Sequence, residues 1–598
     1  MCGFLGSITD SILDEETLKK CNNRIECRGP DEKNFVINNR YGSKNLFHNF
    51  AFNRLAIIDL SKMASQPMYS STFNSLIMFN GEIFNHKELR KKLEKENVEF
   101  HSSHSDTETL LIGLSMYGMD FLNEINGQFS IFFFDVKNEE YYLIRDRTGQ
   151  KPLYFEIQDT NFYFGSDLQS VRKLSKNSEI NQNQVNNYLN LGTTVSPETF
   201  YKNIYSVNPG ELINVSLKNK KFVSIKTKYW DLSKFVDDMA FQEDEFINLF
   251  EDSVNIRLES DVPLSIFLSG GLDSTSIIKA VSKKNDSINT FSMVTNSKNF
   301  NESEFMNKVV NKFESNHLYE NIDLNIDFEK VKSIITKFDD IIYDPSIIPT
   351  YILSEKIAKN FKVALSGDGG DELLSGYQHY VNYFAKNKIS DKFTTIMAHM
   401  YPKRLGTGNT FLRHSSDWKK GFSSFYSDEN LMKLLKLNNY SRFEDIYLTN
   451  KNKDWKSLMM VDLNFYLNEM MLKKIDRSSM LNSLEIRSPF VDHRLFEYII
   501  GHRQFEENED FTPKRIIKKY LSEDFDSDFI DRKKMGFSID LKKIVYKNKS
   551  EIFETINNSF LKEYADVRNI KKLTTIKSRI NATRLWKVYC LSLFFENN

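Results

Sequence analysis

The sequence predicts an α/β protein with two unlike halves. The first is an N-terminal α+β layered domain, and the second is a doubly wound parallel sheet with a helical C-terminal part. Up to about residue 167, short apolar or alternating runs broken by polar turns indicate strands with helices between them. After about residue 235, apolar strands alternate with loops and helices, which is typical of a parallel sheet. Roughly the last 200 residues read mostly as helix.

The chain has 598 residues, which is too long for a single hydrophobic core, so several domains are expected. Region 173–228 is polar, rich in Asn and Lys, and contains a Pro-Gly turn at residues 209 and 210. Such a segment is typical of a domain boundary. We therefore expect domains at 2–215 and 236–598, joined by a linker at 216–235.

The expected elements follow from hydrophobic periodicity. In the first half, the apolar or alternating runs predict strands at 50–58, 75–79, 129–135, 141–145 and 161–164. Helices are expected at 85–97 and 107–117. In the second half, strands are expected at 264–268, 290–294 and 363–365, with a helix that ends at residue 283 and another over 302–313.

Composition excludes several classes of function. The 80 basic residues are balanced by 81 acidic ones, which gives no electrostatic reason to expect nucleic acid or an anionic membrane as a partner. The N-terminus lacks the features of a signal peptide, and no apolar run approaches the roughly 20 residues that span a bilayer. We expect a cytoplasmic enzyme that acts on small molecules. The four cysteines form no CxxC pair and predict neither disulfides nor a zinc site.

A glycine turn near the middle of the chain predicts a phosphate site. The run Ser269-Gly270-Gly271-Leu272-Asp273-Ser274 follows the apolar strand 264–268. Adjacent glycines let backbone N–H groups approach a ligand, and the helix that opens at Ser274 favours an anion at its N-terminus. No Gly-Lys-Ser/Thr follows, so this is not a Walker loop.

A second glycine loop follows the strand 363–365. It reads Ser366-Gly367-Asp368-Gly369-Gly370-Asp371-Glu372. Because ligands bind at the carboxyl ends of parallel strands, we expect the two loops to share one site. Mg²⁺ prefers a few carboxylates together with phosphate oxygens and water, so Asp273 and Asp371 are expected to hold a magnesium ion that bridges a nucleotide.

The N-terminus is a third candidate site. Removal of Met1 would place a thiol and a free α-amine on the same residue, Cys2. An α-amine titrates at about 7.7 to 8.0, so part of it is neutral near pH 7 and can serve as the base for its own thiol.

The first half resembles the class II glutamine amidotransferase domain, an N-terminal-nucleophile hydrolase. The resemblance is carried by Cys2 together with the segments 28–31 (RGPD), 54–59 (RLAIID), 66–68 (QPM), 80–85 (NGEIFN), 105–108 (SDTE) and 145–154 (RDRTGQKPLY). The family usually has His where this chain has Cys27, and Gly-His where this chain has Ala64 and Ser65. The chain departs from the family pattern at these two places.

The resemblance assigns roles to residues of this half. It implies that Cys2 attacks the side-chain amide of glutamine, giving a thioester and ammonia. It implies that Asn80 and the N–H of Gly81 form the oxyanion hole. Glutamine would be bound by Arg54, Asn80, Gly81, Glu82 and Asp106, with Arg54 on its carboxylate and Asp106 on its ammonium group.

The second half resembles the synthetase domain of the asparagine synthetase B family, whose members release pyrophosphate from ATP. Beyond the two glycine loops, the likeness covers segments 476–480 (DRSSM), 483–492 (SLEIRSPFVD), 514–517 (KRII) and 532–537 (RKKMGF). It implies that Asp368 supports acyl-adenylate formation and that Lys514 neutralises phosphate charge. The ATP and pyrophosphate site would consist of Leu268, Ser269, Gly270, Gly271, Asp273, Ser274, Met293, Ser366 and Gly367.

Together the two resemblances imply that aspartate is activated as an acyl-adenylate and that ammonia then displaces AMP. The family also suggests a homodimer. Three alternatives stay open: a different carboxylate acceptor, such as a sugar acid or a peptide; closure of the enzyme's own substrate, as in β-lactam synthetases; and a catalytically silent binding or storage protein. The retained Cys2, Asn80 and Asp106 argue against the last two. tRNA thiolation would require reactive cysteines near the phosphate loop and a basic surface, and the sequence has neither.

Overall fold

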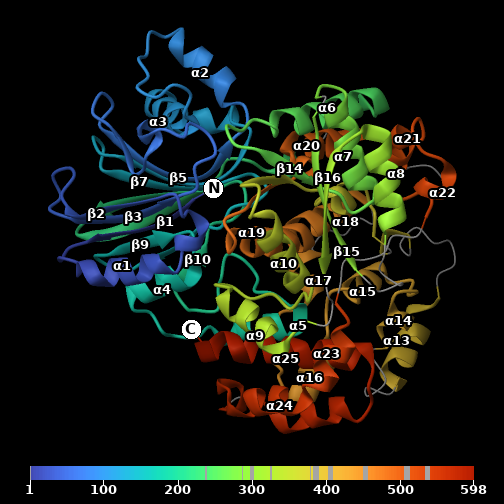
Figure 1. The fold of residues 1–598 in the computed structure, drawn as a ribbon. Helices are drawn as coiled ribbons and strands as arrows, with labels where there is room; N and C mark the ends of the chain where they lie inside the picture. The colour runs from blue at the N-terminus through green and yellow to red at the C-terminus, as the bar shows by residue number, and fades with distance from the viewer. Residues whose placement is uncertain are drawn as a thin grey trace.

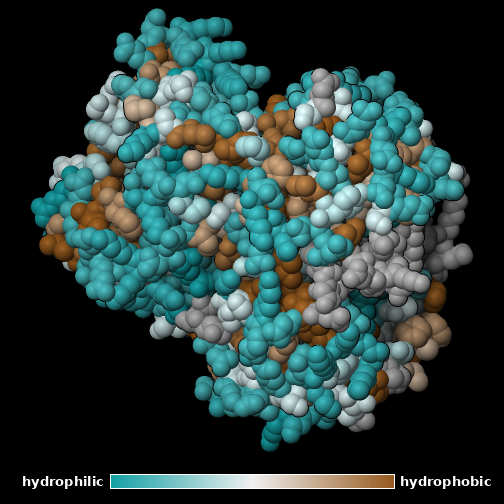
Figure 2. Space-filling model, in the orientation of Figure 1, coloured by the Kyte–Doolittle hydropathy of each residue, from teal (hydrophilic) through white to brown (hydrophobic). Residues whose placement is uncertain are grey.

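The computed structural model contains two halves that lie side by side (Figure 1). It describes residues 2–235, 239–285, 287–295, 302–322, 326–377, 379–381, 389–401, 408–448, 455–503, 512–532, 539–563 and 565–597. In the described part of the chain, none of the helices is both long and apolar enough to cross a membrane. The face seen in Figure 2 is mostly hydrophilic, with hydrophobic groups in patches.

Two antiparallel six-stranded sheets form the first half. One has the strand order β10-β8-β9-β1-β3-β2 and the other β12-β11-β7-β6-β5-β4. Their bounds are β1 Gly3–Thr9, β2 Glu32–Asn39, β3 Phe47–Arg54, β4 Met68–Ser70, β5 Ser75–Ile83, β6 Gly127–Asp135, β7 Glu140–Arg145, β8 Tyr154–Ile157, β9 Phe162–Gly165, β10 Ile204–Ser206, β11 Glu211–Lys218 and β12 Lys221–Lys228.

The two sheets pack face to face because their strands alternate apolar side chains with period two. In β6, Phe132 and Phe134 point into the core between the sheets, while Ile131 and Phe133 face the layer formed with α2 and α3. Helices α1 and α4 contribute to the core on the outer face of the other sheet. The result is a four-layered sandwich, in agreement with the expected α+β layered domain.

A five-stranded parallel sheet organises the second half, as the sequence predicts. Its order is β16-β15-β14-β17-β18, with bounds β14 Leu264–Phe267, β15 Asn289–Thr295, β16 Asn316–Ile322, β17 Val363–Leu365 and β18 Glu485–Arg487. On one side of β14 lie β15 and then β16, and on its other side lie β17 and then β18. The switch point between β14 and β17 therefore lies next to both glycine loops.

Helices cover both faces of this sheet. Ile266 and Leu365 pack into a core formed with α6, α7, α20 and α21. Phe291 and Ala364 pack into a core on the other face, formed with α10 and α19. The second half also contains a short parallel pair of strands, β13 Met239–Ala240 and β19 His502–Arg503. A π-helix spans Asp462–Leu472.

The α-helices have the following bounds: α1 Glu15–Asn23, α2 His86–Glu94, α3 Asp106–Tyr117, α4 Leu168–Ser175, α5 Gln182–Leu191, α6 Glu243–Ile256, α7 Leu272–Ser282, α8 Ser303–Phe313, α9 Phe328–Lys337, α10 Ile347–Ile357, α11 Gly370–Leu373, α13 Asp391–Met400, α14 Asn409–Leu412, α15 Trp418–Ser423, α16 Glu429–Leu435, α17 Phe443–Tyr447, α18 Trp455–Val461, α19 Lys473–Met480, α20 His493–Gly501, α21 Arg515–Leu521, α22 Ser527–Ile530, α23 Leu541–Lys547, α24 Lys549–Asn558 and α25 Arg579–Asn597.

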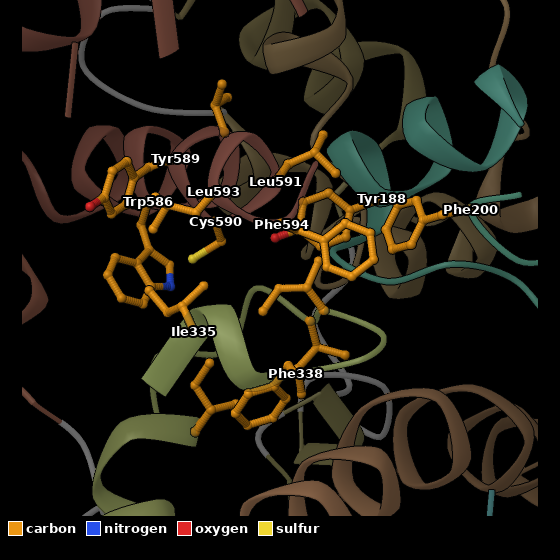
Figure 3. Close-up of a cluster of buried hydrophobic side chains, with 14 of the residues drawn as sticks. Tyr188, Phe200, Ile335, Phe338, Trp586, Tyr589, Cys590, Leu591, Leu593 and Phe594 are labelled. Atoms are coloured by element: carbon orange, nitrogen blue, oxygen red, sulfur yellow. The ribbon is translucent and has the colours of Figure 1, made fainter. Parts of the chain in front are cut away.

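The C-terminal helix α25 ties the two halves together (Figure 3). Trp586 and Phe594 of α25 are fully buried, and they share one hydrophobic core with Tyr188 of α5, Phe200 and Phe338. The rings of Phe200 and Phe594 lie 4.9 Å apart. Burying a large apolar side chain stabilises a fold by about 1.5 to 3 kcal/mol. A core with this many aromatic groups therefore fixes the first half against the second.

The structure differs from the sequence prediction at several places; the strand expected at 75–79, for example, continues to Ile83. The strand expected at 50–58 ends at Arg54, because residues 55–58 turn away to line a cavity. The segment 216–235, which the sequence predicts as a linker, contains the end of β11 and all of β12, and these two strands pair as a hairpin. Phe222 packs its ring between the sheets and so holds this hairpin in the first half. The division of the chain at 215 and 236 stays a prediction.

Candidate active sites

A small cavity of about 30 Å³ lies beside the N-terminus. Five residues predicted for glutamine chemistry line it: Cys2, Arg54, Gly81, Glu82 and Asp106. Leu55, Ile57, Ile58, Ala64, Gln66, Phe79 and Thr107 complete the lining.

Cys2 is held at the start of β1 and is almost fully buried. Burial raises the pKa of its thiol, although the charge of Arg54 acts in the opposite direction. A thiol in this state needs a base before it can attack a substrate. The backbone nitrogen of Cys2 donates to Asn80 Oδ1 at 3.1 Å, and this nitrogen becomes the α-amine if Met1 is removed.

Asn80 and Gly81 lie near the C-terminal end of β5. The side-chain amide of Asn80 donates to Ser130 Oγ at 3.2 Å, which leaves the second N–H of the same group for a further acceptor. Glycine is required at 81, because a Cβ there would lie 2.1 Å from the carbonyl oxygen of Gln128.

Charged groups of both signs surround the cavity. Arg54 donates to the carbonyl oxygens of Asp59 and Ser61 and contacts Glu32, so its position is fixed. Asp106 begins α3 and accepts from the backbone N–H of Ile83 at 3.3 Å, and burial raises its pKa to about 6.

Glu82 is a second carboxyl group on the cavity wall. It is almost fully buried, and burial raises its pKa well above the usual range, although Arg487 partly offsets this. Among the described residues, no group hydrogen-bonds to Glu82 Oε1. This oxygen of Glu82, beside Asp106, can accept a hydrogen bond from an ammonium group.

The two glycine loops of the second half pack directly against each other. A Cβ at Gly367 would lie 2.8 Å from Cβ of Asp273, and a Cβ at Gly370 would lie 2.8 Å from Asp273 Oδ1. Gly270 has φ of 73°, a left-handed conformation that glycine adopts without strain. Ser274 Oγ lies 3.1 Å from Ser269 Oγ and so closes the first loop on itself.

Lys514 joins the two loops. Its ammonium group lies 2.6 Å from both carboxylate oxygens of Asp273 and 2.7 Å from Asp371. Lys514 comes just before α21 and is almost fully buried. Residues that lie 241 positions apart in the sequence thus converge at the switch point of the sheet.

Asp273 and Asp371 fit a magnesium ion in their chemistry. Both are oxygen donors, and the ammonium group that now lies between them shows that this spot accommodates a positive charge. In the described part of the chain, no cluster of three or more potential ligands forms a metal site from protein groups alone. Phosphate oxygens and water would have to complete the coordination.

The remaining predicted ATP residues lie around the same loops. Leu268 is buried and donates its backbone N–H to Phe291 O at 2.9 Å. Met293 is partly buried in the adjacent strand β15. Ser366 Oγ donates to Asp368, which fixes that carboxylate within the second loop.

One predicted motif falls partly outside the described residues. Of segment 532–537, only Arg532 is described, and its guanidinium donates to the carbonyl oxygen of Gly270 at 2.6 Å. Met1 also lies outside the described residues.

Several residues of the first cavity were not predicted from the sequence. Gln66 bonds to the backbone of Phe79 and to Thr107 and so supports the cavity floor. Gln66 belongs to segment 66–68, on which the resemblance partly rests, and this segment was the signal that could have indicated it. The ion pair of Glu82 with Arg487 joins segments 405 positions apart, and the sequence contains no signal for it.

Comparisons with known proteins identify the family of this chain. Residues 1–230 match the family model described as a glutamine amidotransferase domain, and residues 245–594 match the model described as asparagine synthase. Asparagine synthetase [glutamine-hydrolyzing] 1 of Bacillus subtilis is 27% identical, over 95% of this chain and 91% of the relative. A putative asparagine synthetase [glutamine-hydrolyzing] 2 of Methanocaldococcus jannaschii is 31% identical, over 82% of this chain and all of the relative.

A solved structure titled as the allosteric regulatory enzyme of purine biosynthesis is similar at a TM-score of 0.29 and 14% identity, covering 48% of this chain and 64% of that chain. A likeness of this size carries no argument. The two family models together cover nearly the whole chain, and the asparagine synthase model alone covers more than half of it. The chain therefore belongs to the family of glutamine-hydrolysing asparagine synthetases and is a glutamine amidotransferase of that family.

Proposed function

We propose that this amidotransferase makes asparagine from aspartate, with glutamine as the nitrogen donor and ATP as the source of energy. The observation that carries the proposal is the pairing, in one chain, of a cavity around Cys2 with two glycine loops that meet at Lys514. The names of the relatives support aspartate as the acceptor.

The first reaction would take place in the N-terminal cavity. The α-amine of Cys2 accepts the thiol proton, and the sulfur attacks the side-chain amide carbon of glutamine. Asn80 and the N–H of Gly81 stabilise the oxyanion that forms. Loss of ammonia leaves a thioester, and water hydrolyses it to glutamate. Arg54 holds the α-carboxylate of glutamine, while Asp106 and Glu82 hold its ammonium group.

The second reaction would take place at the switch point of the parallel sheet. A carboxylate oxygen of the acceptor attacks the α-phosphorus of ATP, and the bond to pyrophosphate breaks. Ser269, Gly270, Gly271 and Ser274 bind the leaving pyrophosphate through N–H and hydroxyl groups. Ammonia then attacks the acyl carbon, and AMP leaves.

Three residues of the loops would handle the charge of this reaction. Asp273 and Asp371 would hold Mg²⁺, which neutralises phosphate charge when it is bound. Because that ion and Lys514 compete for the same carboxylates, we expect Lys514 to move from Asp273 and Asp371 to the phosphates when the nucleotide binds. Asp368, fixed by Ser366, would support formation of the acyl-adenylate.

The acceptor is the part of the proposal that most needs a test. AMP and glutamate release should be measured with glutamine, ATP, Mg²⁺ and aspartate, and then with a sugar acid or a peptide carboxylate in place of aspartate. We expect aspartate alone to support AMP release in step with glutamate. If another carboxylate supports it and aspartate does not, the enzyme is an amidotransferase with a different product. A homodimer and a cytoplasmic location stay predictions.

A further inference from the structure

Arg487 contacts both candidate sites. Its side chain forms an ion pair with Glu82, which lines the cavity beside Cys2, at 3.2 Å between Nη2 and Oε2. Its backbone carbonyl oxygen accepts from the N–H of Ser366, the first residue of the second glycine loop, at 2.9 Å. One residue thus contacts both sites.

The surroundings of Arg487 leave it little freedom. The side chain is fully buried, and its Nε donates to Glu485 Oε1 at 2.6 Å. Its Nη1 donates to the carbonyl oxygens of Arg257 and Glu259 at 2.9 and 2.5 Å. Because Arg487 stands in β18, directly beside Leu365 of β17, a shift of its side chain is transmitted to the strand that carries the second loop.

Arg487 has two carboxylate partners that belong to different halves of the protein. Glu485 lies on its own strand, and Glu82 lies on the wall of the glutamine cavity. A ligand with an ammonium group would compete with the guanidinium for Glu82. The guanidinium of Arg487 would then shift toward Glu485, and because the backbone carbonyl of the same residue accepts from the N–H of Ser366, the shift would reach the second loop.

We propose that Arg487 is a positioning residue that couples the occupancy of the glutamine cavity to the order of the ATP loop. The inference rests on the proposed function of both sites. Glutamine in the cavity raises the affinity of the loop for ATP, and by reciprocity ATP raises the affinity for glutamine by the same factor. The acceptor would then be activated mainly when ammonia can be supplied.

The binding test uses the full chain with Cys2→Ala, which retains glutamine without hydrolysing it. The ATP dissociation constant is measured by calorimetry with Mg²⁺, with and without saturating glutamine. We expect glutamine to lower it about fivefold or more, at the lower end of typical couplings. Adding Arg487→Lys, which keeps the charge but loses the fork geometry, should bring the factor below about twofold.

Arg257→Lys is the matched control. Arg257 is also fully buried and pairs with Asp492 at 2.9 Å, but its side chain contacts neither Glu82 nor the second loop. This variant should keep the full factor. A coupling factor near one with Cys2→Ala alone, or an unchanged factor with Arg487→Lys, would overturn the inference. If glutamine or ATP does not bind at all, the proposed function fails as well, so the two failures are distinct.

A second measurement needs no change at Arg487. Hydrogen exchange of the segment from Val363 to Leu373 is followed in the Cys2→Ala protein, before and after glutamine is added. We expect the Ser366 amide to exchange at least several-fold more slowly with glutamine, since its bond to the Arg487 carbonyl becomes more persistent. An unchanged rate, with glutamine shown to be bound, would contradict the coupling.

Discussion

Arg28 and Asp476 form a bidentate ion pair across the two halves of the protein, with N–O distances of 2.9 and 3.1 Å. Both side chains are almost fully buried, and Arg28 also donates to the carbonyl oxygen of Cys2 at 3.1 Å. The pair therefore connects the position of the candidate nucleophile to helix α19 of the second half.

Removing one partner of this pair should destabilise the protein strongly. Asp476→Ala leaves the guanidinium of Arg28 buried without the carboxylate that offsets the cost of removing this charge from water. We expect a loss of about 3 to 5 kcal/mol in the free energy of unfolding. Urea denaturation followed by circular dichroism measures it, with Glu16→Ala as the control.

Glu16 forms an exposed pair with Lys20 within α1, so its removal should change stability by no more than about 1 kcal/mol. Equal effects of the two substitutions would show that the Arg28 pair does not hold the halves together.

Lys514 provides a test of the second site. Lys514→Met removes the ammonium group that lies between Asp273 and Asp371, and with it the charge proposed to stabilise the phosphates. We expect AMP release supported by ammonium salts to fall by about 10²-fold or more, as for other electrostatic groups in transition states. Lys519→Met in the adjoining helix α21, at an exposed position, should retain nearly full activity. Equal rates in the two variants would exclude Lys514 from the reaction.

The pH dependence of glutamine hydrolysis should report on Asp106. Burial raises the pKa of this carboxyl to about 6, and only the ionised form attracts the ammonium group of glutamine. As pH falls below about 6, the carboxyl group of Asp106 becomes protonated, so kcat/KM for glutamine should drop by a further factor of about ten per pH unit, in addition to the loss caused by protonation of the Cys2 α-amine. The Asp106→Asn variant should have a low kcat/KM for glutamine at every pH, and its pH profile should lack the additional fall below about pH 6. A wild-type profile that is flat down to pH 5 would contradict the role of Asp106.

Gly81 should not tolerate a side chain. In Gly81→Ala the new methyl group would lie 2.1 Å from Gln128 O and 2.7 Å from Phe129 Cα, both of them backbone atoms that cannot move aside easily. We expect glutamate formation to fall by at least tenfold, since β5 must shift and with it the N–H proposed for the oxyanion hole. Gly421→Ala, whose nearest contact would be at 3.3 Å, serves as the control and should be active.

Local patterns explain how much of this protein could be predicted from its sequence. Both glycine loops and the strands before them are contiguous segments, so Ser269 to Ser274 and Ser366 to Asp371 could be read directly. The parallel order of β14 and β17 followed from the strand, loop and helix repeat. The pairing of β12 was missed because this strand is mostly polar and exposed, with Phe222 buried between the sheets, whereas Ile213 and Val215 of β11 are fully buried there.

Contacts between distant segments could not be predicted. Arg487 meets Glu82, and Arg28 meets Asp476, only because the two halves pack against each other, and no spacing or periodicity encodes that contact. The resemblance implies that Lys514 neutralises phosphate charge. It does not indicate that Asp273 and Asp371, the two predicted metal ligands, both contact the ammonium group of Lys514.

Cys2→Ala tests the central claim, that glutamine is the nitrogen source for an ATP-dependent reaction at a separate site. The account predicts that glutamate formation and glutamine-dependent AMP release both fall at least 10³-fold, because the nucleophile is gone. AMP release supported by ammonium salts and the acceptor should persist in the same protein. Unchanged glutamate formation, or loss of the ammonium-supported reaction in a folded variant, would contradict it.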